Sequence, residues 1–182
     1  MLLSRTASAA RLALLALPAL GGCPWSGESP CDIDGLTEVG LVYADENGSV
    51  HDVGEGDAIP LISAPQGGHI VLVAPRVRAA EQCELQVNAA LRDPASLRVV
   101  GLEERPVVVH PRGDGWAAPE APAGLSDLAN VAVCPSVVTT VDGAPLRLEV
   151  QLLDDAGTRI AGGTATVRPT CSSDYCRSDC GP

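Results

Sequence analysis

Apolar and polar side chains alternate with a period of two along the longest patterned stretches of this chain. From Cys83 to Leu91, apolar residues occupy every second position, and glutamate, glutamine and asparagine stand between them. Leu146 to Leu152 repeats the pattern with arginine, glutamate and glutamine as the polar members. A period of two is typical of a β-strand with one buried and one solvated face. We therefore expect a core built from antiparallel strands that are apolar on one side.

Shorter apolar runs separated by turn residues extend this pattern over the chain. Asn47-Gly48 and Asp154 to Gly157 favour turns, because glycine adopts positive φ at little cost. The segment Ala64 to His69 contains two glycines and indicates a hairpin between two apolar runs. The predicted strands are Thr37–Tyr43, Ile59–Ser63, Ile70–Ala74, Cys83–Leu91, Leu97–Leu102, Pro106–His110, Leu128–Cys134, Leu146–Leu152 and Arg159–Arg168.

Eight or nine short alternating strands with frequent turns are typical of two packed sheets, and no capped helix of ten or more residues is evident. We predict an all-β, disulfide-stapled β-sandwich with an immunoglobulin-like or fibronectin-like topology, by likeness of pattern. The core must be aliphatic, because aromatic residues make up 2% of the chain and phenylalanine is absent. The tryptophan that accompanies the inter-sheet bridge of immunoglobulin domains has no counterpart in this pattern.

The first 22 residues have the features of a bacterial export signal. Arg5 and Arg11 give a positive start, and Leu12 to Leu20 form an apolar run too short to span a bilayer. The run ends at Leu20-Gly21-Gly22-Cys23, which resembles the lipobox of bacterial lipoproteins. The resemblance implies cleavage before Cys23 and a diacylglyceryl anchor on its thiol. The alternative is an ordinary secretory signal, with Cys23 as a further structural cysteine.

The predicted lipid on Cys23 would be the membrane anchor of the mature chain, because no other long apolar segment follows the leader. Pro24 stands where lipoproteins of the inner membrane carry aspartate, so the resemblance implies the outer membrane and leaves the exposed face open. We divide the chain into a leader (1–22), a flexible tether (23–35) rich in proline, serine and glycine, a β-sandwich domain (36–170) and a cysteine-rich tail (171–182).

The net charge of −11 limits the partners of this chain. Nucleic acid and anionic lipid are bound through clustered basic residues, which attract their phosphates. An acidic chain of this kind is not expected to bind nucleic acid.

Six cysteines follow Cys23, and an even number in an exported chain predicts up to three disulfides. They are Cys31, Cys83, Cys134, Cys171, Cys176 and Cys180. The sequence leaves all 15 pairings open. We expect Cys31 to link the tether to the domain. Cys83 and Cys134 stand on different predicted strands about fifty residues apart, roughly the separation of an inter-sheet bridge.

The sequence offers two candidate metal sites. Neither is favoured, so no cofactor is predicted. The spacing of the tail cysteines suits zinc, but zinc needs further ligands and no histidine lies near the tail in sequence. An exported chain also favours disulfides over thiolates. The acidic stretch from Asp45 to Asp57 could offer oxygens to calcium, but its glycine falls at the wrong position for an EF-hand loop.

The segment Pro65-Gln66-Gly67-Gly68-His69 is the most distinctive local motif. It lies in a predicted hairpin and resembles, over about fifteen residues, a segment of uncharacterised lipoproteins of predatory soil bacteria. The resemblance implies no known activity. A glycine-dependent turn accounts for the motif, and His69 is expected to be structural.

Motifs of catalysis and of nucleotide binding are absent, including Gly-x-Ser-x-Gly and the phosphate-binding loop. We therefore predict a non-enzymatic, lipid-anchored envelope module that binds an envelope protein or polymer, or serves a structural role. Trp116, in the strand-free stretch Pro111 to Ser126, is the candidate contact residue, because tryptophan is enriched at binding hot spots. It could instead cover the end of the core. The alternative function is an envelope hydrolase or metal-dependent enzyme whose site is assembled from scattered residues.

Overall fold

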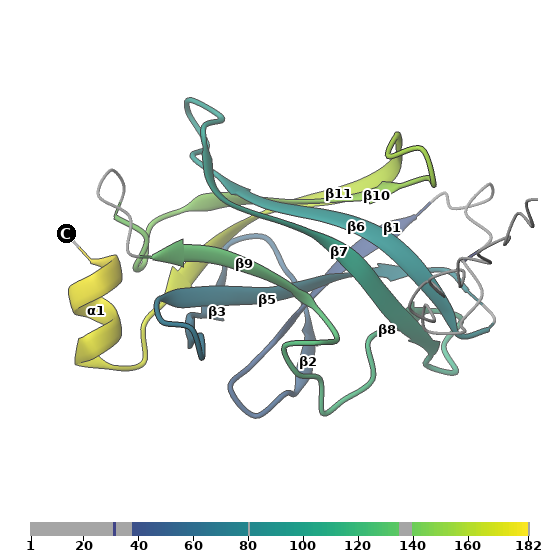
Figure 1. The fold of residues 1–182 in the computed structure, drawn as a ribbon, viewed down its shortest axis with the longest axis horizontal. Helices are drawn as coiled ribbons and strands as arrows, with labels where there is room; N and C mark the ends of the chain where they lie inside the picture. The colour runs from purple at the N-terminus through teal and green to yellow at the C-terminus, as the bar shows by residue number, and fades with distance from the viewer. Residues whose placement is uncertain (1–30, 32–37, 80, 135–139, 182) are drawn as a thin grey trace, which may run out of the picture.

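The computed structural model describes residues 31, 38–79, 81–134 and 140–181. Within them the chain forms eleven strands and one short helix. The strands lie in two layers, with helix α1 at one end (Figure 1). Their bounds are β1 (Val39–Ala44), β2 (Val50–Asp52), β3 (Asp57–Pro60), β4 (Ile62–Ser63), β5 (His69–Val77), β6 (Cys83–Arg92), β7 (Val99–Pro111), β8 (Ala117–Ala118), β9 (Ala129–Cys134), β10 (Leu146–Leu153), β11 (Arg159–Thr170) and α1 (Asp174–Cys180).

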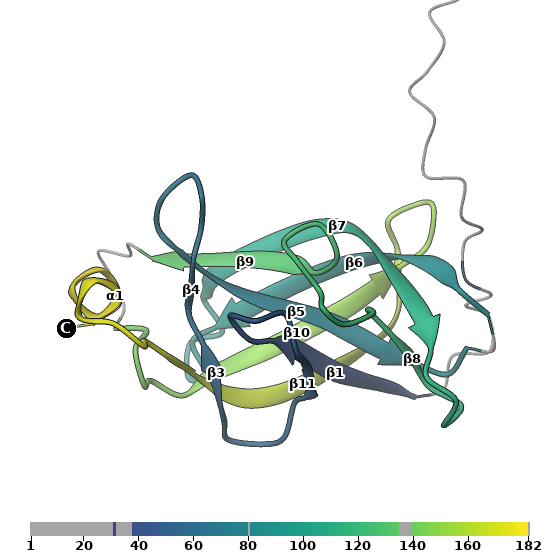
Figure 2. The same cartoon turned by 90° about the horizontal axis from the view of Figure 1, so that it is seen from below.

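The first layer is centred on β5, which pairs antiparallel with β1 along one edge and with β9 along the other. The second layer has the order β3-β11-β10-β6-β7, and its pairs are antiparallel except for β3 with β11. Strand β7 connects the layers, because its last two residues pair with β8 while the rest pairs with β6. Figure 2 shows the two layers from a second side.

This pairing confirms the predicted all-β, disulfide-stapled sandwich. The pairs β5–β9 in one layer and β6–β10–β11 in the other follow the division of strands B and E from C, F and G in immunoglobulin-like domains. Strand β7 occupies the place of an additional strand beside C. Consecutive strands form the hairpins β1–β2, β4–β5, β6–β7 and β10–β11. The pairs β5–β9, β6–β10 and β3–β11 join segments far apart in sequence.

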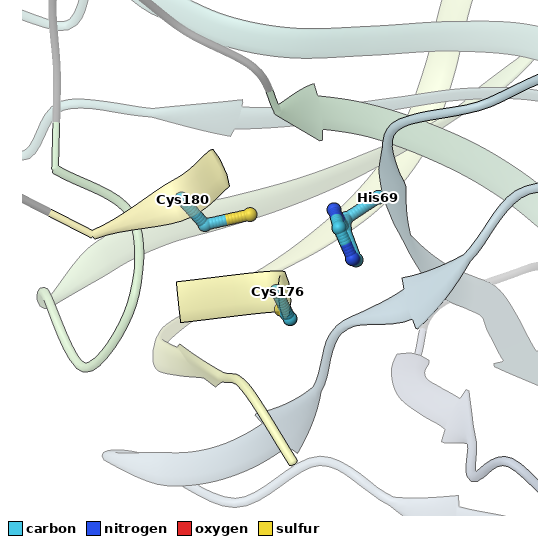
Figure 3. Close-up of side chains that lie close together, drawn as sticks. All are labelled: His69, Cys176 and Cys180. Atoms are coloured by element: carbon cyan, nitrogen blue, oxygen red, sulfur yellow. The ribbon is translucent and has the colours of Figure 1, made fainter. Parts of the chain in front are cut away.

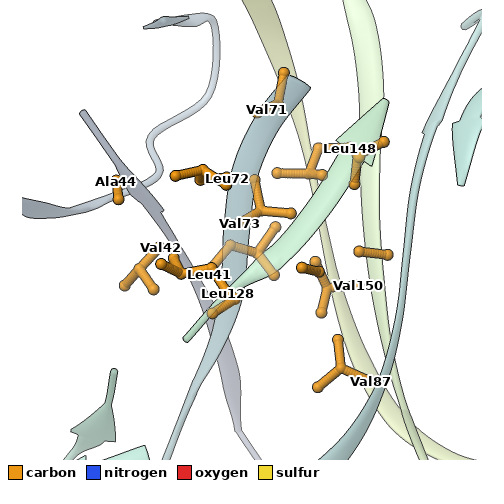
Figure 4. Close-up of a cluster of buried hydrophobic side chains, with 14 of the residues drawn as sticks. Leu41, Val42, Ala44, Val71, Leu72, Val73, Val87, Leu128, Leu148 and Val150 are labelled. Atoms are coloured by element: carbon orange, nitrogen blue, oxygen red, sulfur yellow. The ribbon is translucent and has the colours of Figure 1, made fainter. Parts of the chain in front are cut away.

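The core between the layers is aliphatic, as the composition predicts. Val71 and Val73 of β5 face Leu148 and Val150 of β10, and all four side chains are buried (Figure 4). Each alternating strand delivers its apolar face to this cluster, which is why β6 and β10 match their predicted bounds within one residue. Burial of such a side chain contributes about 1.5–3 kcal/mol.

One predicted strand is two strands in the structure. Residues Ile59 to Ser63 divide at Leu61: β3 pairs with β11 in one layer, and β4 pairs with β5 in the other. Ile59 and Leu61 are both buried in the common core, so the crossing keeps their side chains out of water. Pro60 has no N–H to donate and therefore favours such a break in the ladder.

Two predicted strands, Leu97–Leu102 and Pro106–His110, are one strand, β7. The ladder continues through the charged residues between them. The Arg105 guanidinium donates to the carbonyl oxygens of Leu125 and Leu128, which stabilises its charge at a partly buried position. The very short strands β2 and β8 left no sequence pattern of their own.

Strand β7 passes close to β9 of the opposite layer at Gly101. A Cβ there would clash with the carbonyl oxygen of Ala132 in β9 and crowd the side chains of Val131 and Val133. Glycine is therefore required by space at this position. The separation of the layers depends on this contact as much as on the volume of the core side chains.

Gly101→Ala is expected to lower the free energy of unfolding by about 1–3 kcal/mol, the usual cost of overpacking. The measurement is chemical denaturation followed by circular dichroism. Gly124→Ala is the matched control, because its Cβ would meet the nearest atom, Asp127 Oδ2, at 3.6 Å. Equal stability of the two variants would contradict the close approach of β7 to β9.

Candidate functional site

The predicted lipidation site lies outside the described residues, as do the leader and the tether apart from Cys31. Cleavage before Cys23 and its acylation therefore stay predictions. Cys31 itself is described, and it forms a disulfide with Cys83 at the start of β6. Its backbone N–H also donates to the carbonyl oxygen of Glu84. The expected covalent link between tether and domain is confirmed.

The suggested bridge between Cys83 and Cys134 is wrong. Cys83 pairs in register with Val109 near the β8 end of the sandwich, whereas Cys134 pairs with His69 at the opposite end. Cys134 is instead bonded to Cys180. No covalent bridge is needed between the layer centres, because β5 and β10 meet there through valine and leucine side chains.

The tail contains a helix and part of the core, which the sequence had not indicated. Ser173 caps α1 by accepting the N–H of Cys176, and Asp174 stands in the first turn. Cys176 and Cys180 are four residues apart and hence on one face, and both are buried. The capping serine followed by this spacing was the local signal that could have revealed the helix.

Three disulfides occur among the described residues: Cys31–Cys83, Cys134–Cys180 and Cys171–Cys176. The last two hold α1 against the end of β9 and the end of β11. Structural disulfides persist in oxidising compartments and are rare in the cytosol. The chain therefore belongs to an oxidising, extracytoplasmic environment.

His69 lies beside this helix, although it is far from the tail in sequence. It opens β5 opposite Cys134, so the antiparallel register brings it to the end where α1 packs. Its side chain is fully buried, and neither ring nitrogen has a hydrogen-bond partner among the described residues. The nearest carboxylate oxygen, Asp179 Oδ2, is 3.7 Å from Nδ1, and the Tyr175 ring centroid is 5.6 Å from that of His69.

The side chains of His69, Cys176 and Cys180 point toward one another (Figure 3). One ring nitrogen and the two sulfurs all lie within 4.8 Å of each other. Two arguments from the sequence disfavour a metal site in the tail: no histidine lies near it in the chain, and an exported chain favours disulfides over thiolates. The fold supplies a histidine from β5, which removes the first argument. The second agrees with the structure, because both cysteines are in disulfides.

The acidic stretch from Asp45 to Asp57 forms turns whose carboxylates accept hydrogen bonds from the protein. Asp45 accepts from the His51 ring and from the N–H groups of Ser49 and Asn47, and these bonds hold its pKa below its usual range. The hydroxyl and the N–H of Thr166 lower the pKa of Glu55 in the same way. Asp45 therefore caps its turn, whereas Glu55 contacts β11.

Trp116 lies at the β8 end of the sandwich, in the tight turn between β7 and β8. The guanidinium carbons of Arg76 and Arg78 are 4.3 and 4.0 Å from the ring centroid, within the range of cation–π attraction. Arg76 also pairs with Asp52 at 2.6 Å. Trp116 is half-buried, and its ring lies against the two guanidinium groups.

A groove of about 300 Å³ lies next to this turn. His110, Arg112 and Glu120 are among its lining residues, and the loop after β8 forms one wall. The groove and Trp116 together form what we call the β8-end surface, defined by Arg76, Arg78, His110, Arg112, Trp116 and Glu120.

No family model, curated protein or solved structure matches this chain. Among the described residues, no helix has the length and apolar character that crossing a bilayer requires.

The disulfide pairing predicts a distinctive tryptic map. Trypsin cleaves after arginine, and the arginines place the cysteines in different peptides, except for Cys171 and Cys176, which share one. Without reduction, the peptide ending at Arg76 should be joined to 79–92, and 113–147 should be joined to 178–182. Peptide 160–177 should carry an internal bond between Cys171 and Cys176. Mass spectrometry before and after reduction checks this, and a link between 79–92 and 113–147 would contradict it.

Proposed function

We propose that this chain is a lipid-anchored, non-enzymatic module of the cell envelope, held at the outer membrane through Cys23. The main support for this proposal is the short chain segment that joins the lipobox to the folded domain. Cys23 stands eight residues before Cys31, and Cys31 is bonded to the start of β6. The rigid sandwich is thereby fixed close to the predicted anchor.

The length of that route sets the distance from the membrane. Eight extended residues span at most about 29 Å. The Cys31–Cys83 bond lies at the β8 end, because Cys83 pairs with Val109 just before β7 reaches β8. In our proposal the β8 end therefore faces the membrane, and α1 at the other end points away from it (Figure 1).

This orientation places the β8-end surface where a partner in or near the same membrane could reach it. Tryptophan and arginine are enriched at the centres of binding surfaces, and here two arginines contact one tryptophan ring. We propose that an envelope protein or polymer binds there.

The anchor is tested by the intact mass of the protein extracted from membranes. We expect a chain that begins at Cys23 and carries additional acyl mass. Cys23→Ser should lose both the added mass and the membrane retention, because its hydroxyl is not a substrate for thioether lipidation. Ser26→Ala, in the same tether, is the control and should retain both. A native chain that is unmodified, or cut elsewhere in the leader, would contradict the proposal.

The binding surface is tested by Trp116→Ala. Loss of a half-buried ring and two cation–π contacts should lower the free energy of unfolding by only about 1–2 kcal/mol. Crosslinking in intact cells, followed by mass analysis of the adducts, should show a partner adduct with the native chain. The same adduct should be lost with Trp116→Ala. Tyr175→Ala is the control, because this ring is 64% exposed at the opposite end. A large loss of stability with unchanged adducts would instead assign Trp116 to covering the core.

A further inference from the structure

The disulfides beside His69 do not explain why this histidine is buried without a hydrogen-bond partner. A buried polar group is normally hydrogen-bonded, because burial removes its contacts with water. Both His69 ring nitrogens lack such a bond among the described residues, and the side chain is fully buried. An unpaired buried polar group in a folded protein calls for an explanation, and a bound ion is one of them. Imidazole is the commonest metal ligand among side chains.

The neighbours of His69 are the ligands that a zinc-like cation prefers. Cys176 and Cys180 approach it from one face of α1, with the Cys-x₃-Cys spacing of zinc sites. The three donor atoms lie within 4.8 Å of one another. Donors around a tetrahedral zinc ion are about 3.3–3.8 Å apart, given bonds of about 2.0–2.3 Å. Small side-chain adjustments would bring these atoms to that separation.

We propose that His69, Cys176 and Cys180 form a latent zinc site that opens when the two disulfides of α1 are reduced. This inference is independent of the proposed envelope function. In the oxidised chain the two sulfurs are bonded to Cys171 and Cys134 and are poor ligands. In the reduced chain they become thiols that can ligate a borderline-soft divalent cation.

The reduction balances with two equivalents of a dithiol reductant. Each equivalent transfers two electrons and two protons to one disulfide and becomes a disulfide itself, leaving four protein thiols. On binding, the two ligating thiols each release a proton to solvent, and His69 binds as the neutral imidazole. Cys171 is partly exposed, so the Cys171–Cys176 bond is the one that a reductant can reach from solvent.

The charge of the loaded site suits a buried position. One divalent cation, two thiolates and a neutral imidazole sum to zero, which avoids the cost of a net charge in an apolar setting. Asp179 Oδ2 is 3.7 Å from Nδ1, just beyond hydrogen-bond distance. A small shift of this carboxylate would let it accept the Nδ1 proton and leave Nε2 as the ligand.

The first test uses the full-length chain with Cys23→Ser, Cys134→Ser and Cys171→Ser. This variant leaves Cys176 and Cys180 as free thiols beside His69 and keeps the Cys31–Cys83 bond. Kept anaerobic, it should bind one zinc ion per chain by equilibrium dialysis, and cobalt should give the absorption of a tetrahedral thiolate site. Adding His69→Leu should weaken zinc binding at least tenfold. Adding His110→Leu, a half-buried histidine at the other end, should leave it unchanged.

A second test uses the native chain and does not depend on the folding of a variant. The disulfides are titrated with a dithiol reductant, with and without zinc, and free thiols are alkylated and located by peptide mass. Zinc should lower the reductant concentration at which the two α1 disulfides are reduced, and it should leave the concentration needed for Cys31–Cys83 unchanged. Equal titrations for all three bonds, or zinc binding indifferent to His69→Leu, would overturn the proposal.

Discussion

The packing of β5 against β10 through small aliphatic side chains is the contact on which the rest of the molecule depends. With Val71 and Val73 on one side and Leu148 and Val150 on the other, no aromatic ring separates the layers. The layers can therefore approach closely, as Gly101 shows where β7 passes β9. The other strands of each layer are positioned by hydrogen bonding, directly or through a neighbour, to β5 or to β10.

A thin core buries little surface at the two ends of the sandwich, and those ends are where the disulfides occur. Cys31–Cys83 closes the β8 end, and the two bonds of α1 close the other. A covalent link reduces the conformational freedom of the unfolded chain, which contributes about 2–4 kcal/mol per bond. The disulfides thus hold both ends of this aliphatic sandwich.

Features that depend on residues close together in sequence could be predicted, whereas features that depend on distant residues could not. Strands β6 and β10 were predictable because alternation is a local property of the chain. The crossing at Leu61 and the continuity of β7 depend on partners far away, such as the carbonyl groups that accept from Arg105. Neither is visible in a local pattern.

The candidate sites show the same division. The six cysteines and Trp116 could be named from the sequence, but neither their pairing nor the place of His69 could. His69 meets the tail through the register of β5 with β9 and the packing of α1, and both require the whole fold. The lipid anchor, which rests on a local motif outside the described residues, stays a prediction.

The positions of the disulfides also determine how the molecule would carry a pulling force. Tension applied between an anchor before Cys31 and the end of α1 would pass through Cys83 and Cys134, because both outer loops are bypassed by covalent bonds. Strands β1 to β5 and β10 to β11 lie inside the bypassed segments. Only the chain between the two bridges, about 170 Å when fully extended, could be drawn out. Most of the sandwich would be mechanically shielded.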